Sequence, residues 1–379
     1  MSERAKSAVN PAASAPDTAQ LRRVDRILGE LRRGTPVVLH DRTRAVLVSA
    51  VDTLAPDALA ELHAAAGGPP ELVLTAERAQ RLGLDDGCRD GGDVALSGRD
   101  LGESELLALA DPWGPAPADV AARVATRAAG PLAGAALQAT KLARLLPAAL
   151  QAHLETADPV GWAHARDLLA ASAEDIAGYR GVVARRLCEV AAARVPLKGA
   201  ENARIRAFRP TDGGTEHLGI VIGEPQPGEP ALVRLHSECL TGDLLGSLRC
   251  DCGDQLRGAI DTIAETGAGV LLYLAQEGRG IGLVNKLRAY RLQDAGADTL
   301  DANGVLGFDP DERIYAPAAA MLRTMGFDRV RLLTNNPEKV TALSRHGISV
   351  TERVPHRFPA NPHSAAYIAT KAERFGHLF

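Results

Sequence analysis

Cysteine, long apolar runs and an excess of charge are all scarce in this sequence, and each scarcity excludes a class of protein. Five of the 379 residues are cysteine, an odd number in a long chain, so a disulfide framework is not expected. No apolar run approaches the roughly eighteen residues that cross a bilayer, so no membrane partner is expected. A net charge of −4 leaves no polybasic footprint, so nucleic acid is not the expected partner either.

The first residues do not read as a secretory signal. Residues 1–18 are rich in Ala, Ser and Pro and contain no apolar core of the kind that a secretory signal needs. We expect them to form a disordered tail. Together with the few cysteines, they predict a reducing, cytoplasmic compartment, in which thiols stay free.

Aromatic residues are missing from most of the first half of the chain. Before Tyr179 there is no Phe or Tyr, only Trp113 and Trp162, and Ala and Leu dominate. After about residue 195 the chain gains aromatics, glycine-punctuated loops and β-branched runs. Since the length suits two ordinary domains, we expect one at 19–194 and one at 195–379.

The first half alternates between helical and strand patterns, which is typical of an α/β domain. A helix is predicted at 20–34, strands at 36–41 and 44–50, a helix at 55–68, and a strand followed by a helix at 71–84. Residues 86–118 read as irregular, and nearly all of 122–192 as compatible with helix. No catalytic cluster is evident there; Cys88 and Cys188 are predicted to be structural thiols.

The second half predicts a mixed α/β layer whose loops meet at strand ends, where such folds bind ligands. The predicted strands are 201–210, 217–225, 231–238, 269–277, 330–335 and 348–355. Helices are expected at 254–269 and 282–297, and a third should begin at Pro337, be capped by Asn336 and run to Gly347.

Three of the five cysteines lie within fourteen residues, in the pattern C-x10-C-x-C formed by Cys239, Cys250 and Cys252. Three thiolates this close in sequence can hold one zinc ion, and three protein ligands instead of four leave a coordination position for water, as in catalytic sites. The alternative is three unrelated buried thiols. Clustering in a cysteine-poor chain favours a hydrolytic zinc site.

Two loops between a strand and a helix could bind anions. Glu277-Gly-Arg-Gly-Ile-Gly282 would bring backbone N–H groups and the fork of Arg279 to an anion, although turn glycines alone would explain it as well. Thr334-Asn-Asn-Pro-Glu-Lys339 offers a hydroxyl and an ammonium, or simply a solvated helix start. Beside a zinc loop, the two favour metal-assisted hydrolysis of a phosphorylated substrate.

From about residue 195 to the C-terminus the sequence resembles GTP cyclohydrolase II. The matching runs are VRLHSECLTGDLLGSLRCDCGDQL, QEGRGIGLVNKLRAYRLQDAGADTLDAN, LGFDPDER, VRLLTNNPEKV and TKAERFGHL. The resemblance implies hydrolysis of GTP to 2,5-diamino-6-(5-phospho-D-ribosylamino)pyrimidin-4(3H)-one, formate and pyrophosphate, the first step of riboflavin biosynthesis. It also implies one Zn²⁺ per chain, Mg²⁺ with GTP, and a homodimer.

The same resemblance assigns roles to individual residues. The zinc ligands are Cys239, Cys250 and Cys252; Asp311 is the proton acceptor and Arg313 the proposed nucleophile; and Tyr290 has a catalytic role unless it is simply a packed helix aromatic. Because a guanidinium stays protonated, Arg313 could instead stabilise charge on the phosphates. The positions that bind GTP are Arg234, Leu235, His236, Ser237, Glu238, Gln255, Glu277, Gly278, Arg279, Thr299, Thr334 and Lys339.

Two details of the resemblance bear on the substrate. The carboxylate of Glu277 suits the N1–H and N2–H₂ donors of guanine, a pairing that adenine cannot offer. Ala275 stands before Gln-Glu-Gly-Arg where many family members carry a basic residue, which predicts weaker binding of GTP without a change of reaction.

The first half resembles, more faintly, 3,4-dihydroxy-2-butanone 4-phosphate synthase. The similar runs are ILGELRRGTPVVLHD, LTAERAQRLGL and SAEDIAGYR. Members of that family carry an acidic metal-binding loop after the first strand, where this chain has His40-Asp-Arg-Thr-Arg-Ala. Without those carboxylates Mg²⁺ lacks its oxygen ligands, so we predict a degenerate domain without synthase activity that serves as scaffold, dimer contact or regulator.

Two other functions remain open at this stage. A paralogue could open the ring of a guanine or related purine nucleotide and release a different product. A nucleotide sensor on the same fold would show decay of the cysteine motif or of Asp311 and Arg313, and all five residues are intact.

Overall fold

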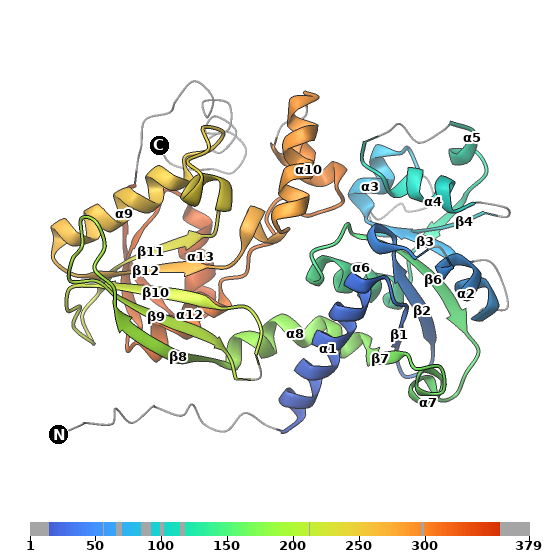
Figure 1. Cartoon of the computed structure of the whole chain (residues 1–379), viewed down its shortest axis with the longest axis horizontal. Coiled ribbons are helices and arrows are strands. Elements are labelled where there is room, and N and C mark those ends of the chain that lie inside the picture. Colours follow the sequence, from blue (N-terminus) through green and yellow to red (C-terminus); the bar gives the residue numbers. More distant parts are fainter. Residues whose placement is uncertain are drawn as a thin grey trace. The chain divides into compact units, whose positions relative to one another are not determined.

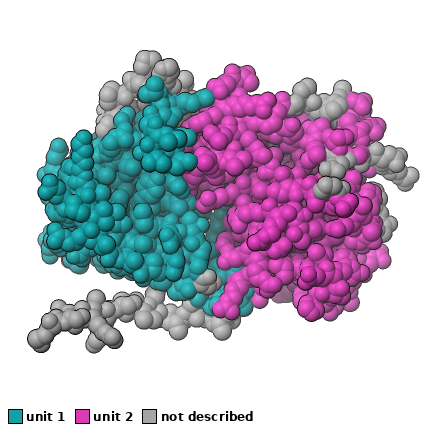
Figure 2. Space-filling model, in the orientation of Figure 1, with its two compact units in different colours: residues 1–21, 180–275, 314–379 teal, residues 22–179, 276–313 magenta. Residues whose placement is uncertain are grey.

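The computed structural model describes residues 15–55, 57–65, 70–84, 92–98, 102–113, 118–211, 213–296 and 299–356. Contacts divide the chain into two compact units, coloured separately in Figure 2. Unit 1 contains residues 1–21, 180–275 and 314–379, and unit 2 contains residues 22–179 and 276–313. The segment 276–313 therefore groups with the N-terminal residues, and the single domain boundary near residue 195 stays a prediction.

Unit 2 is built on a seven-stranded sheet of order β5-β4-β3-β6-β2-β1-β7 (Figure 1). Strands β1 and β7 are parallel, and the other neighbours are antiparallel. The strands are β1 (Val37–His40), β2 (Ala45–Ala50), β3 (Glu71–Leu74), β4 (Val94–Ser97), β5 (Ala125–Ala128), β6 (Ala148–Leu154) and β7 (Leu169–Ser172).

Helices bury both faces of this sheet. Alternate strand residues point to opposite faces, so Val38 packs in one apolar cluster and its neighbours Val37 and Leu39 in the other. The described helices that lie wholly or partly in unit 2, not all of them on the sheet, are α1 (Ala15–Arg33), α2 (Ala58–Ala65), α3 (Ala76–Arg81), α4 (Glu103–Ala110), α5 (Ala118–Ala121), α6 (Pro131–Leu142), α7 (Pro159–His164), α8 (Ala173–Arg185), α10 (Leu283–Asp294) and α11 (Thr299–Val305), with a 3₁₀ turn η1 (Val51–Thr53).

Three expectations for the first half are wrong. The stretch 122–192 is not mainly helical, since it contains β5, β6, β7 and most of β8 (Leu187–Arg194). Alanine favours helix, but hydrogen bonds to β2 and β3 and burial on both sides outweigh that local preference in β6. Strand β4 and helix α4 lie within the predicted irregular region 86–118, and α1 begins at Ala15, inside the predicted tail.

Unit 1 is built on a second seven-stranded sheet, of order β14-β13-β11-β12-β10-β9-β8. Strands β12, β11, β13 and β14 run parallel, and β10, β9 and β8 continue the sheet antiparallel. The remaining strands are β9 (Arg204–Pro210), β10 (His217–Ile222), β11 (Ala231–Ser237), β12 (Gly269–Leu274), β13 (Arg329–Leu333) and β14 (Ser349–Val354). The predicted mixed α/β layer is confirmed.

Among the described residues of unit 1, three α-helices pack on this sheet. Helix α9 (Cys252–Thr266) covers one face through Ala259 and Ile263, whereas α12 (Ala316–Thr324) and α13 (Pro337–Arg345) cover the other. The sequence predicted α9, α10 and α13, including the Asn336 cap, whose side chain accepts a hydrogen bond from the backbone of Glu338. It missed α11, α12 and the turn η2 (Leu240–Leu244).

Replacing Leu150 by Ala should test the central place of β6. This side chain has 0% of its surface exposed, so the cavity should cost about 2–5 kcal/mol in the free energy of unfolding, measured by urea denaturation. On the same strand, His153→Ala is the matched control, because the exposed side chain should cost no more than about 0.5 kcal/mol. Equal losses for the two variants would contradict the assigned burial.

Candidate metal and nucleotide site

The loops that follow the parallel strands of unit 1 carry most of the predicted site. Strand β11 leads to Cys239, β12 to Gln276 and β13 to Thr334. Since parallel neighbours end at the same edge of the sheet, the segments after β11 and β13 begin side by side.

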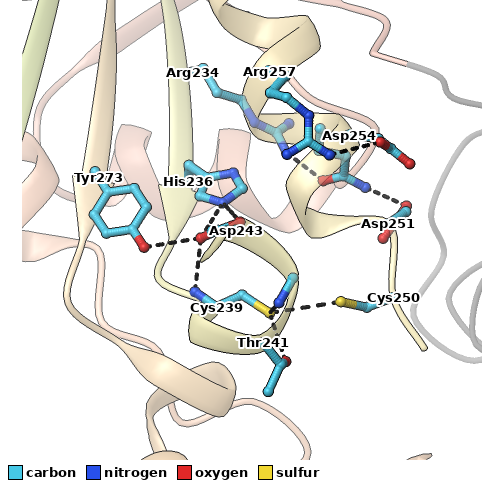
Figure 3. A network of polar contacts seen from close by, with 12 residues as sticks. Arg234, His236, Cys239, Thr241, Asp243, Cys250, Asp251, Asp254, Arg257 and Tyr273 are labelled. Carbon is cyan, nitrogen blue, oxygen red and sulfur yellow. Dashed lines mark hydrogen bonds and ion pairs between the residues drawn. The ribbon is translucent and has the colours of Figure 1, made fainter. Parts of the chain in front are cut away.

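The three thiols of the cysteine motif meet at this edge. Their sulfur atoms lie within 4.8 Å of one another, and the Sγ atoms of Cys239 and Cys250 are 3.7 Å apart (Figure 3). Two thiolates on one tetrahedral zinc, with Zn–S bonds of about 2.3 Å, would be separated by about 3.8 Å. The hydrogen-bonded contact with Cys239 raises the pKa of Cys250 to about 11, and the pKa of Cys252 is also raised, so a bound cation would be needed to favour the thiolates.

Gly242 closes the cluster from the side of the loop. A Cβ at this position would lie 2.8 Å from Cys250 Sγ and 3.1 Å from Cys239 Sγ, so only glycine fits. Its backbone N–H also points to Cys239 Sγ at 3.4 Å. A compact set of three soft sulfur donors suits Zn²⁺ better than a hard cation.

Asp243 fastens this loop to the sheet, a function that the sequence interpretation missed. Its carboxylate accepts hydrogen bonds from the backbone N–H of Cys239 at 3.0 Å and from the hydroxyl of Tyr273 at 3.0 Å, and its Oδ1 lies 3.0 Å from Nε2 of His236 (Figure 3). The rings of His236 and Tyr273 stack with centroids 5.7 Å apart. Asp243 lies inside the C-L-T-G-D motif, but nothing in its spacing indicated these partners.

A chain of hydrogen bonds joins Arg234, Gln255 and Asp251 next to the thiols. Arg234 donates to the carbonyl of Leu333 at 3.0 Å and to the side-chain oxygen of Gln255 at 2.6 Å. The amide of Gln255 in turn donates to Asp251. The structure thus brings together Arg234 and Gln255, two predicted nucleotide-binding residues from β11 and α9.

Lys339 and Thr334 lie at the end of β13 and the start of α13. The ammonium of Lys339 donates to the carbonyl of Leu235 at 2.8 Å, and the hydroxyl of Thr334 accepts from the backbone of Asn336 at 3.0 Å. Burial and, after it, the positive charge of Arg234 lower the pKa of nearby His356 to about 3. This part of the site is cationic, as anion binding requires.

The other predicted residues of β11 differ in exposure. Leu235 is buried in the sheet core, whereas Ser237, the last residue of the strand, is half-buried. The backbone N–H of Glu238 donates to the carbonyl of Leu274 at 2.8 Å, which continues the pairing of β11 with β12 past the strand end. Leu235 can therefore contact a ligand only through its backbone atoms.

The loop η3 (Glu277–Gly280) belongs to unit 2. Gly278 and Arg279 have φ angles of 62° and 63°, which a turn of this kind requires and which only glycine adopts without strain. The Glu277 carboxylate is buried and accepts from Nζ of Lys286 and from the backbone N–H of Gly278, both at 2.9 Å. A non-glycine residue in this conformation is common at ligand-binding sites.

Asp311 and Arg313 form an ion pair in the same unit. Oδ1 of Asp311 accepts from the backbone N–H of Arg313 at 3.0 Å and from its Nε at 2.8 Å. Burial would raise the pKa of Asp311, but hydrogen bonds and charge from Arg313 outweigh it and hold that pKa below its usual value. Tyr290 lies on α10, and the ammonium of Lys286 is 5.6 Å from the centre of its ring. Thr299 begins α11, but the side chain of Thr299 lies outside the described residues. Cys88 and the run TKAERFGHL also lie outside the described residues.

Each of the two units contains some of the residues predicted to bind the metal or the nucleotide. Unit 1 holds the thiols and a cationic strand edge, and unit 2 holds a carboxylate loop and an Asp–Arg pair. A soft-metal cluster at the carboxyl edge of a mixed sheet is typical of metal-dependent enzymes that act on small molecules.

The sequence comparisons identify the family. The sequence model of the GTP cyclohydrolase II family matches residues 188–355. The GTP cyclohydrolase-2 of Azospirillum brasilense is 55% identical over 370 residues, which are 96% of this chain and 95% of the relative. The chain belongs to the GTP cyclohydrolase II family.

Other similarities cover less or are weaker. The GTP cyclohydrolase-2 of Pseudomonas aeruginosa is 54% identical over 189 residues, 50% of this chain and 92% of the relative. The two-domain 3,4-dihydroxy-2-butanone 4-phosphate synthase RibBX of A. baumannii is 17% identical, covers 89% of this chain and 100% of its own, and has a TM-score of 0.35. At that score a shared fold is not established. Among the described residues, no helix has the length and apolarity to span a membrane.

Replacing Asp243 by Ala should loosen the thiol loop. Loss of a residue that orients metal ligands typically lowers metal affinity by roughly 10–100-fold, and we expect a change of this size for Co²⁺, followed by its thiolate absorption bands. Asp254→Ala is the control, since that carboxylate is 59% exposed and pairs with Arg257 (Figure 3). Unchanged Co²⁺ affinity in the Asp243 variant would contradict the assigned role.

Acid should destabilise the chain in part through His356. Its pKa is lowered to about 3 when folded, against about 6.5 when unfolded, so the unfolded chain binds the extra proton between these values. The stabilisation is complete above pH 6.5 and is lost as the pH falls, by at most about 1.4 kcal/mol for each pH unit. His356→Gln should flatten the urea-unfolding free energy between about pH 6.5 and 3; an identical slope would contradict this assignment.

Proposed function

We propose that this chain is a zinc-dependent GTP cyclohydrolase II. It hydrolyses GTP to 2,5-diamino-6-(5-phospho-D-ribosylamino)pyrimidin-4(3H)-one, formate and pyrophosphate, the first step of riboflavin biosynthesis. The observation that carries the proposal is the cluster of three sulfur atoms within 4.8 Å, at the carboxyl edge of the sheet, in a member of this family.

Cys239, Cys250 and Cys252 would hold one Zn²⁺ per chain. The ion would act as a Lewis acid and activate water for opening the five-membered ring at C8. The protein's own part is to hold the three thiolates close together: Gly242 allows the loop to pack on the sulfur atoms, and Asp243 ties it to the sheet.

Glu277 would recognise the guanine base. A carboxylate accepts hydrogen bonds only, so it complements the N1–H and N2–H₂ donors of guanine and opposes the acceptor N1 of adenine. Lys286 and the N–H of Gly278 fix its orientation, which supports a role in selecting GTP over ATP.

The remaining residues would bind the triphosphate with Mg²⁺. Arg279, Lys339 and Thr334 offer two cations and a hydroxyl, the donors that phosphate oxygens need. The lowered pKa of Asp311 keeps its carboxylate ionised and so able to accept a proton, but it also makes the carboxylate a weak base. Its ion pair keeps Arg313 charged, which supports stabilisation of phosphate charge over nucleophilic attack.

The N-terminal half would lack synthase activity. In His40-Asp-Arg-Thr-Arg, Asp41 is the only carboxylate, and its Oδ1 accepts hydrogen bonds from the backbone N–H groups of Thr43 and Arg44, both at 2.8 Å. A carboxylate that already accepts hydrogen bonds from its own turn is poorly placed to bind Mg²⁺. The homodimer and the cytoplasmic location stay predictions.

The test is incubation of the purified chain with GTP, Mg²⁺ and Zn²⁺, with formate and pyrophosphate measured separately. We expect one formate and one pyrophosphate for each GTP. Pyrophosphate without formate would favour a partial reaction, and neither product would favour the sensor.

Cys250→Ser should abolish formate release. Loss of a metal ligand should cost more than the roughly 10–100-fold that loss of an outer residue costs. Cys188→Ser is the matched control, because that thiol lies on β8 and donates to the carbonyl of Arg209, away from the cluster. Equal turnover by the wild type and Cys250→Ser would refute the zinc mechanism.

A further inference from the structure

We infer that the N-terminal part of unit 2 positions the segment 276–313, with Lys141 and Asp52 as the positioning residues. The inference rests on the proposed function, because that function assigns Glu277, Arg279, Asp311 and Arg313 to the nucleotide. It gives the degenerate N-terminal half a specific role in the cyclohydrolase reaction. All the contacts that carry it lie within unit 2 (Figure 2).

Lys141 forms a buried ion pair with the residue between Asp311 and Arg313. Its Nζ lies 2.8 Å from Oε1 of Glu312, and the two side chains are only 12% and 5% exposed. A second contact, of 3.2 Å, joins Lys141 to Asp309. Burial would lower the pKa of Lys141, but the two carboxylates outweigh it and raise that pKa, so the ammonium stays charged.

Glu312 connects the two loops that carry the proposed chemistry. Its backbone N–H donates to the carbonyl of Arg279 at 3.1 Å, and its carboxylate accepts from the backbone N–H of Asp309 at 3.2 Å. Gly280 packs so closely on Glu312 that a Cβ would lie 2.8 Å from its carbonyl oxygen. Whatever fixes Glu312 therefore fixes η3 and the Asp311–Arg313 pair together.

Asp52 holds the helix that follows η3. Its carboxylate accepts from both Nη atoms of Arg288 on α10, at 2.9 and 2.5 Å, and from the backbone N–H of Leu146 at 3.3 Å. On the same helix, Asn285 donates to the carbonyl of Arg144 at 3.0 Å. The start of α10 is thus bound to the turn between α6 and β6 by side chains as well as by packing.

The two sides of this contact differ in how they are built. Lys141 lies in the last turn of α6, whose apolar residues pack against the sheet of unit 2, so its backbone is firmly placed. The described part of 276–313 forms helices and loops but no strand, and its largest apolar cluster is Leu146, Ile281, Ala289, Leu292, Ala302, Leu306 and Phe308. The polar contacts of Lys141 and Asp52 therefore fix the position of segment 276–313 more precisely than this small apolar cluster does.

Some relatives are too short to contain an N-terminal half like that of this chain. The 189 matched residues cover 92% of the Pseudomonas aeruginosa relative, so that chain has no room for a counterpart of the whole N-terminal half. The corresponding segment there must be held by other contacts. Positioning by counterparts of Lys141 and Asp52 is therefore not open to a chain of that length.

The test is Lys141→Met in the full chain, which removes the ammonium but keeps an apolar stem of similar length. We expect kcat/KM for GTP to fall by roughly 100-fold, since displacement of catalytic groups by about 1 Å has effects of this size. Zinc content should be unchanged, because the cysteines belong to unit 1. Lys141→Arg should restore most of the activity.

Hydrogen–deuterium exchange of the substrate-free protein provides a readout independent of turnover. Peptides covering 276–282 and 306–313 should exchange faster in Lys141→Met than in the wild type. Asp52→Asn is the second variant, and it should speed exchange around Arg288 even if Lys141→Met fails to fold.

Arg127→Met is the matched control. Arg127 on β5 pairs with Glu71 on β3 in the same unit, away from the segment, and its side chain is 45% exposed. It should leave exchange of 276–313 and kcat/KM unchanged. If both Lys141→Met and Asp52→Asn leave exchange and kcat/KM at wild-type values, the inference is wrong; if the wild type releases no formate, the proposed function fails while the exchange result still decides the positioning role.

Discussion

The crowding of three thiols is the constraint on which the candidate site depends. Sulfur atoms within 4.8 Å of one another resist ionisation, and the raised pKa values of Cys250 and Cys252 express that cost. A divalent cation reverses the balance, because each thiolate then faces a positive charge. The glycine at 242 and the carboxylate at 243 are what keep the sulfur atoms crowded in spite of the cost.

The carboxyl edge of the parallel strands gives this cluster its surroundings. Arg234 and Lys339 create a positive region beside the thiols, and burial together with this charge lowers the pKa of His356 to about 3. Charge of this sign would strengthen the attraction of a triphosphate and would also favour thiolates over thiols. The thiol cluster and these two cationic side chains would thus support each other electrostatically.

Under the proposed function, the N-terminal half has no chemistry of its own but keeps a use as a scaffold. The acidic loop expected of a synthase is replaced by a turn in which Asp41 bonds to its own backbone. The rigid sheet remains, and the contacts of Lys141 and Asp52 give it a role in placing residues 276–313. A scaffold requires only a stable fold, so the catalytic carboxylates can disappear while the core stays intact.

The sequence predicted those elements whose local signals were strong. Val37–His40 and Ala45–Ala50 are apolar runs that could only be buried strands, and Asn336-Pro337 is a helix start by itself. Strand β6 was missed because its alanines favour helix in isolation and become a strand through hydrogen bonds to β2 and β3. The cysteine motif was predictable because its three ligands lie within fourteen residues; the partners of Asp243 were not, since Tyr273 is thirty residues away.

By itself, the sequence determined the family, the clustering of three thiols and those elements with strong local signals, because each of these depends on neighbouring residues and their spacing. Only the tertiary structure decided which distant groups meet: Asp243 with Tyr273, Arg234 with Gln255, and Lys141 with Glu312. The physical reason is that a charge or hydrogen bond acts over a few ångströms in space, whatever the separation along the chain. The packing of each sheet and its helices sets that distance.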